Sequence, residues 1–320
     1  MAHTYPIVTI FGGSGFLGRS IVQDIAKLGY SIRIASRTPQ AAYELRTAGV
    51  VGQVVPELCS YSIEDINRLV KGSDYVINLV GILAQSGKNS FDRIQKQIPS
   101  NIAKACAAYD VKRFIQLSAL GVDDNTSQYA RTKKAAEEII LDVCPMATIL
   151  RPSIVFGPGD DFFNRFAKMA QIAPALPLIG GGKTKFQPVY VGDVAQAVMQ
   201  CLTEGADIFE GEIIELGGPE IVTFKQCLER MFKYTKQPKP LANLPFFMAK
   251  PMGAVFQALP IKPFTKDQVI SLTFDNVVTG RYKTFADLDI KPTGLASVLP
   301  NYLERYVPGG KFGTMKAKDA

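Results

Sequence analysis

Three regularly spaced glycines lie where an apolar run gives way to a helical pattern near the start of the chain. The run is Ile7–Phe11, the helical pattern is Phe16–Leu28, and Gly12, Gly15 and Gly18 occupy the turn and the helix start. In such a turn the first glycine permits the bend, the second lets a pyrophosphate approach the backbone, and the third lets the helix pack on the strand. A plain strand-to-helix turn is the alternative. A second strand follows as the dinucleotide motif requires, which favours a dinucleotide site.

Strand and helix patterns alternate along the first half of the chain. This alternation predicts an α/β fold, a Rossmann-type doubly wound parallel sheet with helices on both faces. Further strands are expected at Ser31–Ser36, Gln53–Val55, Tyr75–Val80, Arg113–Leu117, Ala147–Leu150 and Glu212–Leu216. Helices are expected at Ala41–Ala48, Ile63–Val70, Phe91–Tyr109 and Ala130–Leu141, with a strand end running into a helix over Val189–Leu202.

The composition of the sequence changes after Arg151-Pro152, where Pro and Gly become more frequent. We therefore expect a nucleotide-binding Rossmann domain over residues 1–155, to which the chain returns at about 187–218. Residues 156–186 and 219–308 are expected to form a smaller, mostly helical C-terminal domain. Residues 309–320 are expected to be a tail.

Composition excludes several classes of protein. The formal net charge of +7 has no nucleic-acid-binding motif beside it, so we expect no nucleic-acid partner. Five cysteines without close pairs predict no disulfide framework, and the single histidine, His3, argues against a metal site. No apolar run reaches about eighteen residues, so no membrane-spanning helix is expected. The first strand starts at residue 7, so we also expect no targeting peptide.

The end of the second predicted strand indicates which nucleotide the turn selects. A carboxylate there would bind the ribose 2′-hydroxyl of NAD, but the chain reads Ala35-Ser36-Arg37. A guanidinium at Arg37 can instead pair with a 2′-phosphate, with Ser36 and Arg19 assisting, which favours NADP(H). A solvated surface arginine is the alternative. Val80-Gly81 would let the ligand pass close to the backbone, and Leu58 would lie by the adenine.

Three polar residues suggest chemistry near the fifth strand. Tyr129 and Lys133 stand four apart on one helix face, and Ser118 follows the strand Arg113–Leu117. A lysine beside a tyrosine lowers the phenol's pKa, and a serine can hold a substrate oxygen while hydride moves to or from a nicotinamide. Alone the Tyr-x-x-x-Lys spacing is common, but after a Rossmann strand it is more specific.

The combined motifs resemble the extended and atypical short-chain dehydrogenases from about residue 6 to 300. The segments that carry this resemblance are Gly12–Gly18, Ser118, Tyr129–Lys133, Arg151–Gly157 and Val189–Asp193. Within that superfamily the chain most closely resembles the NADPH-binding accessory subunits of respiratory complex I, the alpha-subcomplex subunit nine family. The further segments are Val8–Arg19, Val76–Gly81, Phe186–Val191, Asp267–Ile270 and Asp275–Val278.

The resemblance implies bound NADPH that is structural, without established turnover, and complex I subunits as partners. It places the protein peripherally at the inner membrane, on the cytoplasmic or matrix side. It also implies that Pro152 and Ser153 lie by the nicotinamide and that Tyr129 and Lys133 serve as ribose ligands. The expected cofactor-binding residues are Gly12, Ser14, Gly15, Phe16, Leu17, Gly18, Arg19, Ser36, Arg37, Leu58, Val80, Gly81, Tyr129, Lys133, Pro152 and Ser153.

Two alternatives stay open at this point. Retention of Ser118, Tyr129 and Lys133 also suits a soluble NADP-dependent reductase, epimerase or dehydratase that uses them as catalytic residues. The apolar segment 244–266, which prolines exclude from spanning a bilayer, suits either the core of the small domain or contact with a hydrophobic subunit or the membrane surface. The family resemblance favours membrane contact.

Overall fold

The computed structural model describes residues 5–203, 205–256 and 264–309, and its centre is one parallel sheet of eight strands. The strand order is β14-β11-β6-β5-β4-β1-β2-β3, and every pairing is parallel. The strands are β1 (Ile7–Phe11), β2 (Ser31–Ser36), β3 (Val54–Leu58), β4 (Tyr75–Asn78), β5 (Arg113–Leu117), β6 (Thr148–Pro152), β11 (Ile213–Leu216) and β14 (Lys283–Thr284).

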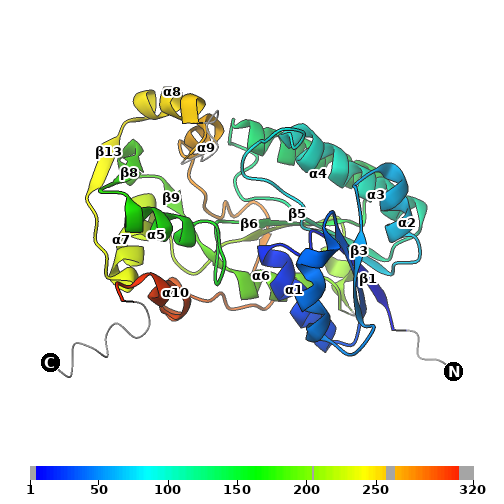
Figure 1. The fold of residues 1–320 in the computed structure, drawn as a ribbon. Coiled ribbons are helices and arrows are strands. Elements are labelled where there is room, and N and C mark those ends of the chain that lie inside the picture. The colour runs from blue at the N-terminus through cyan, green and yellow to red at the C-terminus, as the bar shows by residue number, and fades with distance from the viewer. Residues whose placement is uncertain (1–4, 204, 257–263, 310–320) are drawn as a thin grey trace, which may run out of the picture.

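Helices cover both faces of this sheet (Figure 1), so the predicted doubly wound α/β fold is confirmed. One face packs against α1 (Phe16–Lys27), the 3₁₀ segment η1 (Pro39–Ala48) and α6 (Val191–Gln200). The other packs against α2 (Ile63–Val70), α3 (Ile98–Ala108) and α4 (Gln128–Val143), with a π-helical segment η2 (Asp92–Gln97) before α3. In α1 the apolar residues recur at helical spacing, which buries Ile21, Val22 and Ile25 on the sheet.

Parallel pairing brings the carboxyl ends of the strands to one edge of the sheet. Phe11 pairs with Ala35 on one side and with Asn78 on the other, and Asn78 pairs with Gln116. The loops that follow these strands therefore meet along this edge, where open α/β sheets bind their ligands.

Most predicted strands are found within one or two residues of their expected ends, and β3 and β14 differ most from the prediction. β3 runs to Leu58 and not to Val55, because an edge strand with a proline and exposed side chains lacks the continuous apolar run of a buried strand. β14 has only two residues and no recognisable pattern, yet it pairs with β11 and extends the sheet. A segment between residues 219 and 308 thus returns to the large sheet.

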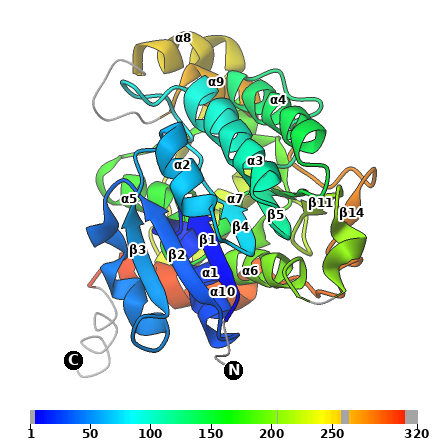
Figure 2. The same cartoon turned by 90° about the vertical axis from the view of Figure 1, so that its right-hand side faces the viewer.

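A second, mostly helical region lies beside the sheet (Figure 1), as predicted. A separate apolar core joins its helices α5 (Phe163–Ile172), α7 (Phe224–Thr235) and α10 (Leu295–Leu303). The helices α8 (Phe246–Phe256) and α9 (Lys266–Ser271) form a small unit at the outer end of the molecule (Figures 1 and 2).

Several short elements complete the chain. They are β7 (Val155–Phe156), β8 (Leu176–Ile179), η3 (Gly180–Gly182), β9 (Lys185–Phe186), β10 (Val189–Tyr190), η4 (Ala206–Phe209), β12 (Val222–Thr223), β13 (Leu241–Leu244) and η5 (Glu304–Tyr306). In the part of the chain that the structure describes, every helix is too short or too polar to cross a membrane. The described residues do not include 257–263, which belong to the apolar segment 244–266. They also do not include 310–320 of the predicted tail.

A buried charge network ties β6 to α4. The guanidinium of Arg151 is fully buried and donates to Glu137 at 3.0 and 2.5 Å and to Asp123 at 2.6 and 3.2 Å. The ring of Tyr282 lies 4.7 Å from this guanidinium, and its hydroxyl donates to Asp123. Since a buried arginine needs paired charges and satisfied donors, this network holds the helix that carries Tyr129 against the sheet.

Candidate functional site

The glycine turn seats α1 directly on the end of β1. Gly12 has a φ of 81°, in the region that favours glycine, and Gly15 N–H donates to the Gly12 carbonyl at 3.1 Å. A Cβ on Gly18 would lie 2.5 Å from the backbone of Gly13. Only glycine at this position allows the helix to start so close to the strand, with its N-terminal N–H groups facing the carboxyl edge of the sheet.

A cleft of about 340 Å³ opens at this turn. It collects residues from the loops after β1, β2, β3 and β4, as expected for a parallel sheet. The lining residues are Gly12, Ser14, Gly15, Ser36, Arg37, Thr38, Ala41, Tyr61, Leu79, Val80 and Gly81. Seven of these, all but Thr38, Ala41, Tyr61 and Leu79, are among the predicted cofactor-binding residues.

The lining supplies positive charge where the second strand ends. Arg37 is exposed and donates to the Asn89 side chain at 3.2 Å. Ser36 is buried and its hydroxyl donates to the Thr38 carbonyl. None of the described residues that line the cleft is acidic. The electrostatics of the wall therefore suit an anionic group on an adenosine ribose.

Nine of the sixteen predicted cofactor-binding residues do not line this cleft: Phe16, Leu17, Gly18, Arg19, Leu58, Tyr129, Lys133, Pro152 and Ser153. Arg19 pairs with Glu44 and donates to the Ala41 carbonyl, so it braces the cleft wall formed by η1. Phe16 and Leu17 start α1, and Leu17 packs against the core of that face. Leu58 is 61% exposed at the edge of the sheet.

The sequence analysis did not identify Tyr61, which lines the cleft, or Asn78, which does not line it but shapes a loop beside it. Tyr61 follows β3 with a left-handed backbone (φ 64°), and burial raises the pKa of its phenol to about 12. The sequence signal that could have identified Tyr61 is its position just after a strand. The loops that follow parallel strands meet at the carboxyl edge of the sheet, where ligands bind. Asn78 ends β4, donates to Gln116 at 2.8 Å and accepts the Val80 N–H at 3.1 Å, which shapes the loop containing Gly81.

The side chain of Lys133 reaches from α4 to the end of β5, where Ser118 follows the strand. The ammonium of Lys133 donates to the Leu117 carbonyl at 3.1 Å, and a Cβ on Gly81 would lie 3.7 Å from this nitrogen. Ser118 is buried, and its hydroxyl has no hydrogen-bond partner among the described residues. An unsatisfied buried hydroxyl is costly, so this group is suited to a bound ligand. Lys133 thus links the glycine-lined cleft to the predicted catalytic residues.

Tyr129 lies on the first turn of α4, one helical turn before Lys133. Its ring packs edge-on against Phe91, with centroids 5.9 Å apart. Burial and the nearby carboxylate of Asp267 raise the pKa of Tyr129 to about 12. A phenol with this pKa holds its proton at neutral pH, which is the opposite of the lowering expected from an adjacent lysine.

Pro152 and Ser153 lie at the end of β6, on the same edge. Ser153 is buried, and its hydroxyl donates to the Asn276 side chain at 2.6 Å. Asn276 in turn donates to the Leu120 carbonyl at 2.8 Å. Ser153 therefore already has a protein partner, from a loop more than a hundred residues away. Asp193 accepts two hydrogen bonds from Thr293 and likewise braces a loop.

The donor set fits a nicotinamide dinucleotide. The glycine turn offers backbone N–H groups to a diphosphate, and Arg37 offers a guanidinium to the adenosine side. Ser118, at the end of β5, has a hydroxyl without a partner among the described residues. These features define a Rossmann-type nucleotide site with the Ser-Tyr-Lys set of short-chain dehydrogenases.

Comparison with known proteins agrees with this class. The sequence profile of the NAD dependent epimerase/dehydratase family matches residues 8–217. The chain is 35% identical to NADH dehydrogenase (ubiquinone) 1 alpha subcomplex subunit 9, mitochondrial, of Arabidopsis thaliana, over 96% of this chain and 80% of that protein. It is 32% identical to the NADH-ubiquinone oxidoreductase 40 kDa subunit of Neurospora crassa, over 93% and 79%.

A solved structure shares the fold. The NADPH-dependent quinone oxidoreductase of Escherichia coli, solved with NADPH, has a TM-score of 0.70 at 17% identity, with coverage of 92% of this chain and 98% of that one. The chain belongs to the NAD dependent epimerase/dehydratase family and, within it, to the group of the alpha subcomplex subunit 9 proteins. The predicted family is therefore confirmed.

The buried ammonium of Lys133 predicts a pH dependence of stability. Burial lowers the pKa of Lys133 to about 8, from 10.5. Between these values the unfolded chain binds more protons, so the free energy of unfolding should rise with pH, by about 3 kcal/mol in total. Lys133→Met should abolish this rise in urea titrations of nucleotide-free protein from pH 7 to 10.5.

The neighbouring Lys134→Met variant is the matched control. Lys134 pairs with Asp123 at 2.9 Å, and the pKa of Lys134 is raised, so its contribution should stay flat up to pH 10. Parallel stability curves for wild type and Lys133→Met across this window would show that Lys133 is not the buried charge described.

Proposed function

We propose that this chain is an NADP(H)-binding accessory subunit of a NADH:quinone oxidoreductase of the complex I type. The observation that carries the proposal is similarity to proteins named as subunits of that enzyme over almost the whole chain. Its partners would be other subunits of the complex. It would lie peripherally at the inner membrane, on the cytoplasmic side in a bacterium or the matrix side in a mitochondrion.

The bound nucleotide is proposed to be NADP(H), held mainly for structure. Arg37 at the cleft and the absence of acidic residues among its described lining support the phosphorylated nucleotide. A nicotinamide nucleotide supplies hydride-transfer chemistry when bound, but a phenol of raised pKa at Tyr129 is poorly suited to proton transfer. Lys133, Tyr129 and Ser118 would then serve as ligands for the nicotinamide half.

A structural ligand can stabilise the fold substantially. A molecule that binds only the folded state stabilises it by about 2.7 kcal/mol at a hundredfold excess over its dissociation constant. This is a large share of the stability of an ordinary domain. Assembly of the complex would therefore depend on the nucleotide.

The exposed face of α8 is the proposed contact with the membrane surface. Phe247 is 76% exposed and Val255 is 65% exposed, whereas Ala249 and Gly253 are buried against the rest of the chain. Lys250 is also exposed on this helix. Apolar side chains beside a lysine suit the interface of a bilayer with anionic headgroups.

The net positive charge of the chain is concentrated in the region that carries α8, as contact with anionic lipid requires. Residues 156–186 and 219–308 contain sixteen Lys and Arg against nine Asp and Glu, whereas 1–155 with 187–218 contain seventeen against nineteen. The positive surplus of the chain therefore lies in the region that carries α8. Anionic lipid attracts such a region over a distance set by ionic strength.

A catalytic alternative rests on the hydroxyl of Ser118. This group is buried without a partner among the described residues, as expected of a residue that orients a substrate oxygen. A soluble NADP-dependent reductase, epimerase or dehydratase would then use Tyr129 as acid or base. Turnover of a carbonyl or nucleotide-sugar substrate should in that case fall at least about hundredfold in Tyr129→Phe, measured as NADPH oxidation. Absence of turnover in the wild type across such substrates would remove this alternative.

Reversal of charge at Arg37 should weaken the binding of NADPH much more than the binding of NADH. Arg37→Glu should weaken NADPH binding by at least about tenfold, because charge-assisted contacts to a phosphate are worth about 1.5–3 kcal/mol. NADH, which lacks the 2′-phosphate, should be affected much less in calorimetric titration. Recovery of the assembled complex from solubilised membranes should fall together with nucleotide content.

Arg46→Glu provides the same charge change on η1 outside the cleft lining. Equal NADPH affinity in the two variants would contradict the assignment of Arg37. Normal assembly with an empty site would contradict the structural role of the nucleotide.

Membrane contact predicts a loss of lipid binding when the face of α8 becomes polar. Phe247→Ser should lower partitioning onto vesicles with anionic lipid by about tenfold, since burial of a phenylalanine is worth about 1.5–3 kcal/mol. Ile208→Ser, at a site that is 65% exposed on η4, should leave partitioning unchanged. Equal partitioning of both variants in vesicle sedimentation would show that α8 is not the contact.

A further inference from the structure

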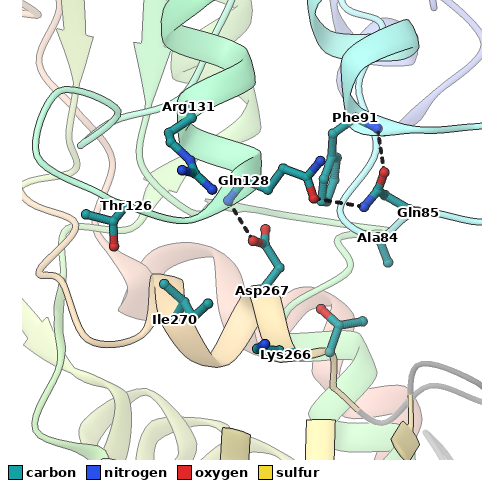
Figure 3. Close-up of a pocket in the computed structure, with 10 residues that line it drawn as sticks. Ala84, Gln85, Phe91, Thr126, Gln128, Arg131, Lys266, Asp267 and Ile270 are labelled. Atoms are coloured by element: carbon teal, nitrogen blue, oxygen red, sulfur yellow. Dashed lines mark hydrogen bonds between the residues drawn. The ribbon is translucent and has the colours of Figure 1, made fainter. Parts of the chain in front are cut away.

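Helix α9 contacts the N-terminus of α4, the helix that carries Tyr129. The carboxylate of Asp267 accepts the N–H of Gln128 at 2.7 Å and the N–H of Tyr129 at 3.1 Å, across 139 and 138 residues of chain. Figure 3 shows this carboxylate below the N-terminus of α4, in a small cavity lined by residues of both helices. The contact joins the second region to the first turn of α4.

Asp267 completes a cap that the local sequence provides only in part. Ser127 is the N-cap of α4, and its hydroxyl accepts the N–H of Ala130 at 3.1 Å. The first four N–H groups of a helix have no partner within the helix. The two that Ser127 leaves open, at Gln128 and Tyr129, are those that Asp267 binds. A carboxylate at this end also interacts favourably with the helix dipole.

The position of Asp267 is itself fixed from several sides. Thr265 and Gln268 form a capping box at the start of α9, and the side chain of Gln268 donates to the Leu83 carbonyl at 3.3 Å. Val269 is fully buried in the small core of α8 and α9. A Cβ on Gly253 of α8 would lie 2.8 Å from the Lys266 nitrogen, so the two helices are in close contact.

The first turn of α4 controls the nicotinamide half of the site. Tyr129 lies in this turn, and Lys133 one turn later reaches the carbonyl next to Ser118. We propose that Asp267 is a positioning residue, which sets Tyr129 and Lys133 for the nicotinamide half of the nucleotide by completing the cap of α4. The proposal rests on nucleotide binding as proposed above. Because Asp267 lies on α9, which packs on α8, this residue would also connect the exposed helix α8 with the cofactor site.

The test compares two ligands on the full chain. Adenosine 2′,5′-bisphosphate carries the 2′-phosphate but no nicotinamide, so it reports only on the adenosine half. Asp267→Ala should weaken NADPH binding by about tenfold and change the affinity for the bisphosphate by less than about twofold. Amide exchange at residues 128 and 129 should become faster. Asp267→Asn, which keeps one acceptor oxygen, should fall between wild type and Asp267→Ala.

Asp142→Asn is the matched control, because it removes one negative charge from the exposed far end of the same helix. An equal loss for NADPH and the bisphosphate in Asp267→Ala would indicate general destabilisation and overturn the proposal. So would an NADPH affinity equal to that of Asp142→Asn. A wild-type chain that binds neither ligand would instead refute the proposed function on which the inference rests.

Discussion

The close contact between Gly18 and Gly13 is the constraint on which the rest of the site depends. It allows α1 to start immediately after β1, so that the helix N-terminus opens at the carboxyl edge of the sheet. The parallel register then brings the loops after four strands to the same edge, including those with Arg37, Tyr61 and Gly81. A side chain at residue 18 would push the helix away and open the turn that the cleft requires.

Much of this was predictable from the sequence, because it depends on local patterns. β1 and β2 lie at the predicted residues, and the cleft lining contains seven of the predicted cofactor residues. Chemistry confined to one turn or one helix, such as the glycines or the spacing of Tyr129 and Lys133, leaves a signal in a few adjacent residues. The same holds for Arg37, whose meaning follows from its place at the end of a strand.

The rest depends on contacts between residues far apart in the chain, which no local pattern records. The bonds from α4 to Asp267 and from Ser153 to Asn276 each cross more than a hundred residues. Leu58, predicted near the adenine, is 61% exposed at the end of β3, and it is Tyr61 in the loop after this strand that lines the cleft. Arg19 is paired with Glu44, a partner that spacing alone does not indicate.

The long-range contact between Asp267 and the first turn of α4 supports the proposed binding role of Ser118, Tyr129 and Lys133. A tyrosine acts as an acid or base near neutral pH only if its surroundings favour the phenolate, and burial of Tyr129, together with the nearby carboxylate of Asp267, disfavours the phenolate. That carboxylate also orders the turn on which Tyr129 lies. If nucleotide binding and the contact of α9 with α4 both favour this ordered turn, the nucleotide must strengthen the α9–α4 contact as much as that contact strengthens nucleotide binding. This follows because a coupling free energy is reciprocal. A nucleotide without turnover would then act on the exposed helix α8 as much as on its own cleft.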